Sequence, residues 1–130
     1  GFLSHLITLV PGSSQYFKGA IVSYANEMKE KSLGVNPVTI EKYGAVSEET
    51  VIEMLHGLLS HTSADIGVAI SGVAGPDGGT VEKPVGTIWV ALGSKEKHQT
   101  FLVKAGKNRE KNIQYAAYVS LNYLRLFLLN

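Results

Sequence analysis

The sequence contains no cysteine, a single tryptophan and no long uninterrupted apolar run. The absence of cysteine excludes a disulfide framework and a thiolate metal site, and it is typical of a protein in a reducing cytoplasm. Apolar runs of only a few residues predict neither a membrane span nor a secretory signal peptide. We therefore expect a cytoplasmic protein that acts away from membranes.

Charge is also scarce, at 18% of the residues, and the formal net charge is only +1. The basic residues are spread along the chain, whereas binding to a nucleic-acid backbone needs a basic stripe, so nucleic acid is not an expected partner. The four histidines lie far apart in the sequence and show no metal-ligand spacing. They are His5, His56, His61 and His98. We expect neither a metal nor another cofactor.

What the chain does have is a high apolar content, 45% over 130 residues, which predicts one globular domain. The apolar spacing at residues 2–7 indicates the tail of a helix. β-branched and aromatic residues at 20–24 predict a buried strand. Asn26 is the expected N-cap of a helix to Leu33, which Gly34 and Pro37 end.

Further along, Ser47 is a plausible N-cap, and the apolar spacing from Val51 to Leu59 predicts an amphipathic helix. Strands are expected at 66–70, 85–92 and 99–103, the last two as a hairpin. A final helix over 109–128 is expected to bury five apolar positions. These are Ile113, Ala117, Leu121, Leu124 and Leu128. The predicted fold class is α/β, a three-layer α/β/α sandwich with a mixed sheet.

Two side chains near the end of the first expected strand suggest acid–base chemistry. Tyr24 closes that strand, and Lys29 follows about one helical turn into the next element. A desolvated amine has a lowered pKa and serves as a base. Alternatively, Tyr24 covers the core and Lys29 is solvated surface, and the spacing alone favours this structural interpretation.

A glycine-rich loop from Gly72 to Gly79 follows the strand at 66–70 and also includes Gly75 and Gly78. Glycines let backbone N–H groups approach an anion closely, although a long structural turn would also use them. Ser13 and Ser14 either bind substrate or cap the local backbone. Arg109, at the start of the last helix, either grips a phosphate or lies solvated on the surface.

Several segments together resemble the C-terminal domain of the bacterial CinA family in order and spacing. They read Pro-Gly-Ser-Ser-x-x-Phe at 11–17, Tyr-x-Asn-Glu-x-Lys at 24–29, Gly-Ala-Val-Ser at 44–47, Ser-Gly-x-Ala-Gly-Pro-Asp-Gly-Gly-Thr at 71–80 and Glu-Lys-Pro-Val-Gly-Thr at 82–87. The likeness covers essentially the whole chain. It implies hydrolysis of the carboxamide of nicotinamide mononucleotide to nicotinic acid mononucleotide and ammonia, in pyridine-nucleotide salvage.

The resemblance also implies roles for individual residues. Family members use a serine nucleophile assisted by a tyrosine and a lysine, which fall on Tyr24 and Lys29. Which of the two is the immediate base is left open, as is homo-oligomer formation. The residues that the resemblance places at the substrate are Gly1, Ser13, Ser14, Asn26, Gly75, Gly78, Gly79 and Arg109.

The chain departs from the family pattern at two places. The family's serine lies in a Glu-Ser-Cys-Thr-Gly-Gly segment whose last glycine aligns with Gly1, so residues 1–130 are expected to form one domain without its first strand and its nucleophile segment. Near Arg109, the family often has Gly-Asp-Arg where this chain has Gly-Lys-Asn-Arg. The alternative functions are a noncatalytic nucleotide-binding or interaction domain of a longer CinA-type protein, and a phosphate-recognising module for another ligand.

Overall fold

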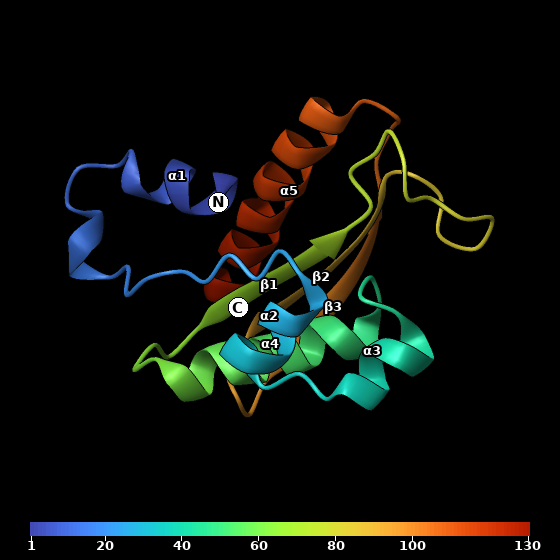
Figure 1. The fold of residues 1–130 in the computed structure, drawn as a ribbon. Helices are drawn as coiled ribbons and strands as arrows, with labels where there is room; N and C mark the ends of the chain where they lie inside the picture. The colour runs from blue at the N-terminus through green and yellow to red at the C-terminus, as the bar shows by residue number, and fades with distance from the viewer.

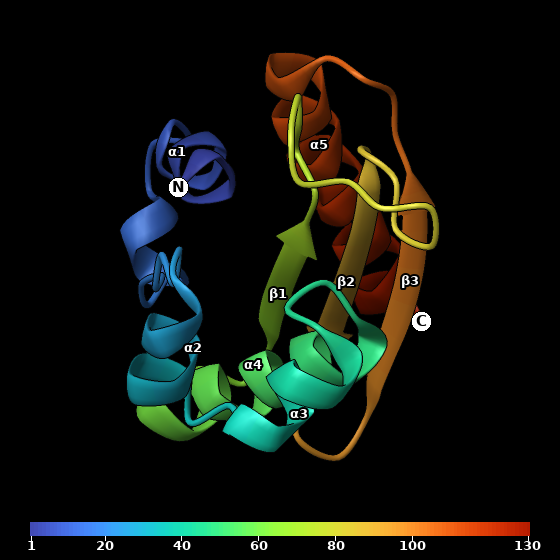
Figure 2. The same cartoon turned by 45° about the vertical axis from the view of Figure 1, so that its right-hand side comes forward.

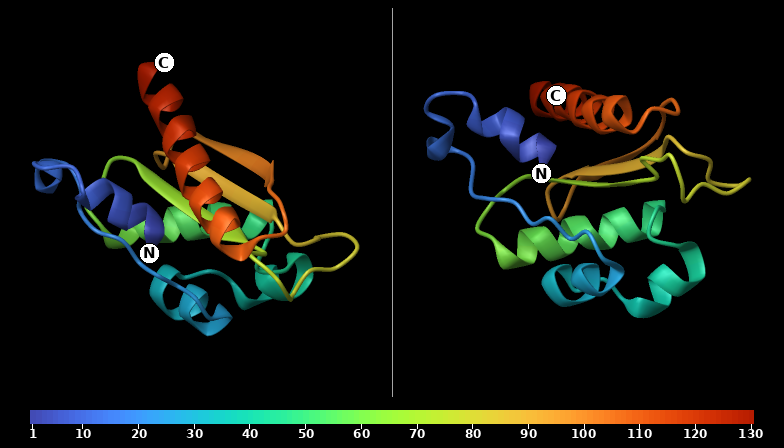
Figure 3. Two further views of the ribbon diagram at one scale, coloured as in Figure 1. Left: turned by 90° about the horizontal axis from the view of Figure 1, so that it is seen from above. Right: turned by 45° about the horizontal axis from the view of Figure 1, so that its top comes forward.

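Helices lie on both faces of one sheet in the computed structural model, which describes all of residues 1–130. The long helix α5, Arg109–Leu129, covers one face, and α4, Glu48–His61, covers the other. Seen from the edge, α5, the sheet and α4 form three successive layers, with α2 and α3 outside α4 (Figure 3). The predicted α/β architecture with helices on both faces is confirmed.

The sheet consists of β1, Gly67–Gly72, β2, Thr87–Gly93, and β3, His98–Lys104, in that order. Both pairings are antiparallel, with Ile70 opposite Val90 and Val90 opposite Phe101. The predicted hairpin of the last two strands is confirmed. The prediction of a mixed sheet is corrected, because these residues form no parallel pair.

The strand predicted at residues 20–24 is not formed either. This segment has no assigned strand structure, and Val22 is 61% exposed. It runs from the first turns of the chain into α2, on the β1 side of the sheet (Figure 2). β-branched content favours a strand, but a strand also needs a neighbour with which to exchange backbone hydrogen bonds. Residues 20–24 have no such neighbour among the strands of this sheet.

Two apolar cores lie on opposite faces of the sheet. Between α4 and the sheet, Val51 and Leu55 pack with Ala69 and Ala91. Between α5 and the sheet, Val90 and Leu92 pack with Ala116. Alternate residues of β2 thus serve different cores, because successive strand side chains point to opposite faces.

α4 begins as the sequence predicts, since the Ser47 hydroxyl accepts a hydrogen bond from Thr50 N. α5 is capped by Asn108, whose side chain accepts from Lys111 N. The buried face of α5 differs from the prediction: Ala117 is buried, but Ile113 is 38% and Leu128 61% exposed. The buried residues of α5 are small or polar, namely Asn112, Ala116, Ala117 and Ser120. The spacing of the apolar residues alone therefore predicts the wrong face of the helix as the buried one.

The first part of the chain contains α1, Phe2–Thr8, a 3₁₀ turn at Ser13–Gln15, and α2, Asn26–Leu33. The N-cap of α2 is Ala25, with no side-chain capping bond, which corrects the prediction that Asn26 caps this helix. A further helix, α3, Pro37–Tyr43, was not predicted. The signal for it was present, because the Asn36 side chain accepts from Val38 N and Pro37 occupies the first turn, where proline is well tolerated.

Candidate active site

Three segments that are far apart in the sequence meet through the guanidinium of Arg109. Its Nη1 donates to the carbonyl of Gly75 at 2.8 Å, and its Nη2 donates to the phenol oxygen of Tyr24 at 3.0 Å. The structure therefore brings together three residues that the sequence analysis named separately. Arg109 is positioned for this because it is the first residue of α5, beside the glycine-rich loop. Arg109 nevertheless stays exposed, so its side chain is both solvated and hydrogen-bonded, and a phosphate-binding role stays a prediction.

Lys29 is buried at 6% exposure, although lysine is among the residues least often buried without a charged partner. Its Nζ donates to the carbonyls of Ser23 at 3.1 Å and Tyr24 at 3.5 Å, at the end of the extended segment. Burial removes water from the ammonium group and lowers the pKa of Lys29 below its usual 10.5. The interpretation of Lys29 as solvated surface is therefore wrong in this structure.

Tyr24 and Lys29 lie close in the chain, but their functional groups take different partners. The phenol meets Arg109, whereas the amine meets main-chain carbonyls, one of which belongs to Tyr24 itself. The Tyr24 side chain is 80% exposed. Of the two, only Lys29 has the buried environment that makes a side chain a better base at neutral pH.

The glycine-rich loop is built so that side chains are excluded at two of its named positions. A Cβ on Gly75, whose φ is +88°, would lie 2.5 Å from a methyl carbon of Val85. A Cβ on Gly79 would lie 2.7 Å from Val85 N. Gly78 has φ +90° and more open space around it. Gly78 and Gly79 line a surface depression of about 580 Å³ between the loop and Lys107.

A second side chain holds this loop to α5, and the sequence analysis missed it. Asn112 is 2% exposed and donates from Nδ2 to the carbonyls of Ala74 at 3.1 Å and Gly106 at 2.9 Å. Its Oδ1 accepts from Gly106 N at 3.0 Å. Both N–H donors of the amide and one of the two acceptor positions on its oxygen are thus used to join two loops. The only sequence signal was a large polar residue on the inner face of α5, where the other buried residues are small.

The remaining residues named from the sequence are not joined to this network by hydrogen bonds. Ser13 is buried in the 3₁₀ turn and Ser14 is exposed, and that turn lies across the molecule from the glycine-rich loop (Figure 1). Asn26 is exposed at the start of α2. Gly1 lies beside Val22, on the extended segment that leads to Tyr24. Their contacts with substrate stay predictions.

No three histidine, cysteine, aspartate or glutamate side chains gather as metal ligands. None of the helices combines the length and the apolar character that crossing a membrane requires.

Comparison with known proteins identifies the family. The model of the CinA C-terminal domain matches residues 1–128. The chain belongs to this family. A CinA-like protein of Cytophaga hutchinsonii is 47% identical over 125 residues, which is 96% of this chain but 30% of that protein. The chain thus spans less than a third of the length of this curated CinA relative.

Solved CinA structures have the same fold. The competence damage-inducible protein A of Klebsiella pneumoniae matches all of this chain with 30% identity and a TM-score of 0.96, over 81% of its own chain. The competence/damage inducible protein CihA of Agrobacterium tumefaciens matches 97% of this chain with 32% identity and a TM-score of 0.94, over 78% of its own chain. The CinA resemblance drawn from the sequence motifs is confirmed.

Proposed function

We propose that this CinA domain hydrolyses the carboxamide of nicotinamide mononucleotide to nicotinic acid mononucleotide and ammonia, with Lys29 as the general base. The buried amine of Lys29, with its lowered pKa, is the observation that carries the proposal. A general base works best when its pKa lies near the working pH, and desolvation moves an amine in that direction. A lysine kept only for surface charge would have no reason to be buried against two carbonyls.

The nucleophile in this proposal is a serine in the segment that the family has before the position of Gly1. Gly1 lies beside Val22, on the extended segment whose last carbonyls accept hydrogen bonds from Lys29 Nζ. We therefore expect a side chain just before Gly1 in the chain to lie near this amine. Neutral Lys29 takes the proton of the serine hydroxyl as the oxygen attacks the carboxamide carbon. The ammonium then returns that proton to the leaving nitrogen, which departs as ammonia, and water hydrolyses the acyl-enzyme.

Arg109 and the glycine-rich loop are the groups proposed to hold the nucleotide. A guanidinium offers two parallel N–H donors to a phosphate, and Arg109 has further donors besides the two already engaged. Backbone N–H groups at Gly78 and Gly79 border an open depression, where an anion or an oxyanion finds donors without a side chain in the way. Tyr24, fixed by Arg109, is proposed to position the nicotinamide end.

The test is ammonia release from nicotinamide mononucleotide by the full-length protein. Lys29→Ala is expected to lower kcat by more than about tenfold, on the usual scale for loss of a general base. Lys31→Ala is the matched control, because Lys31 is an exposed lysine on the same helix, and it should leave kcat unchanged.

Two outcomes would contradict the proposal. Equal turnover of the Lys29 and Lys31 variants would remove Lys29 from the chemistry. Tight binding of nicotinamide mononucleotide without ammonia release, by a folded protein that carries the serine, would favour the noncatalytic nucleotide-binding domain instead.

A further inference from the structure

A separate depression of about 540 Å³ lies where β3 passes into α5. Three of its ten lining residues are lysines, and none is a carboxylate. Its basic and aromatic lining residues are Lys104, Lys107, Lys111, Tyr115 and Tyr118. In a chain with a net charge of only +1, this is a local concentration of positive charge. Such a hollow attracts an anion.

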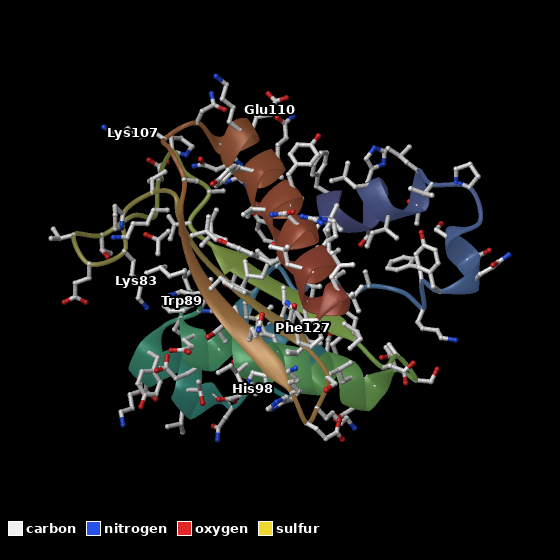
Figure 4. All side chains as sticks on the ribbon, turned by 180° about the vertical axis from the view of Figure 1, so that it is seen from behind. Lys83, Trp89, His98, Lys107, Glu110 and Phe127 are labelled. Carbon is white, nitrogen blue, oxygen red and sulfur yellow. The ribbon has the colours of Figure 1, made fainter.

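The depression is distinct from the candidate active site. Arg109 turns its guanidinium to Gly75 and Tyr24 and does not line it. Glu110 lies at the same end of the molecule as Lys107 but is not among the lining residues either (Figure 4). Lys107 borders both this depression and the one beside the glycine-rich loop, so the two are neighbours.

The depression also offers aromatic surface next to its charge. Tyr115 follows Lys111 by one helical turn, and Tyr118 follows by nearly another, so the three side chains share a face of α5. The two rings are 48% and 54% exposed. Tyr118 also packs edge-on against Phe2 of α1, with ring centroids 6.0 Å apart, which holds one ring in place. Exposed tyrosine rings beside cations are suited to stacking a base.

We propose that this depression is a second binding site, for a mononucleotide, with the phosphate among the lysines and the base against the tyrosines. The volume is that of a small-molecule site and suits one nucleotide. A strand of nucleic acid would need a longer basic track than these three lysines provide. Because Lys107 borders both depressions, a nucleotide held here lies next to the glycine-rich loop.

The test is calorimetric titration of the full-length protein with adenosine 5′-monophosphate and, separately, with inorganic phosphate. The double variant Lys104→Gln/Lys111→Gln is expected to weaken binding of the nucleotide by about tenfold or more, because two charge-assisted contacts are lost. The matched control, Lys18→Gln/Lys95→Gln, removes the same charge from exposed lysines elsewhere and should leave binding unchanged. Slowed amide exchange within residues 104–118 on binding would place the nucleotide.

The tyrosines are tested through the difference between the two ligands. Tyr115→Ala should weaken binding of the nucleotide by about tenfold and leave that of phosphate unchanged, since only the nucleotide has a base to stack. Equal loss in the two double variants would overturn the proposal. Protection that appears at the glycine-rich loop but not at 104–118, or binding of single-stranded oligonucleotides without binding of the mononucleotide, would also overturn it. None of these readouts depends on amide hydrolysis, so the proposed activity can fail while this site stands.

Discussion

Replacing Gly57 with alanine should separate two effects of opposite sign. Gly57 lies inside α4, where alanine is favoured over glycine by about 1 kcal/mol. A Cβ at this position, however, would lie only 1.7 Å from the carbonyl oxygen of Leu33, at the end of α2. Helix propensity therefore predicts a more stable protein, and packing predicts a less stable one.

The magnitude follows from that distance. To reach an ordinary contact of 3.4 Å, the Leu33 carbonyl must retreat by about 1.7 Å, and a backbone atom cannot do so by a change of rotamer. Overpacking of this kind typically costs about 1–3 kcal/mol, and the upper end is expected where backbone must move. After the gain in propensity, Gly57→Ala should lose about 2 kcal/mol of unfolding free energy.

The assay is urea unfolding together with turnover. Turnover should fall as well, because α2 carries Lys29 one helical turn before Leu33, and small misplacements of a catalytic group are costly. Ser60→Ala, an exposed change in the same helix, is the control and should stay within about 0.5 kcal/mol of the parent. A Gly57→Ala protein as stable as the parent, or more so, would refute the close approach of the two helices.

Two further predictions concern buried polar groups. In the folded protein the pKa of Lys29 is lowered below 10.5. At pH values between the lowered pKa and 10.5, the unfolded chain binds a proton that the folded chain has released. The free energy of unfolding should therefore rise with pH in that range. Lys29→Met should flatten that rise in urea unfolding series at several pH values, and an unchanged slope would show that Lys29 does not cause it. Asn112→Leu leaves polar backbone atoms of Gly106 and Ala74 unpaired and should cost about 1–3 kcal/mol or more, raising KM as the glycine-rich loop loosens. Wild-type stability and KM in that variant would show that the loop needs no such support.

The elements that could be predicted from the sequence are those whose causes are local. α4 follows from a capping serine and a periodic apolar stripe, and the hairpin of β2 and β3 from two apolar runs around a short turn. The segment at 20–24 has the composition of a strand, but composition does not reveal whether a neighbouring strand is present. α3 was missed because Pro37 was interpreted as the end of one helix and not as the start of the next.

The candidate site divides in the same way. The motifs identify Lys29, but its burial depends on tertiary packing that no short stretch of sequence encodes. The hydrogen bond from Arg109 to Tyr24 spans 85 positions, and that from Asn112 to Ala74 spans 38. Such contacts arise only once the fold has brought the segments together. A polar residue on the inner face of a helix is the kind of signal that could direct attention to Asn112 in advance.

The division of the apolar interior by the sheet has a practical consequence for protein engineering. Neighbouring residues of β2 pack into different cores. Ala91 lies in the core that also contains Leu33 of α2, and Val90 lies in the core between the sheet and α5. The basic amine is carried by one half and the guanidinium by the other. Conservative substitutions at these two adjacent positions should therefore act first on different groups, although both groups contact Tyr24.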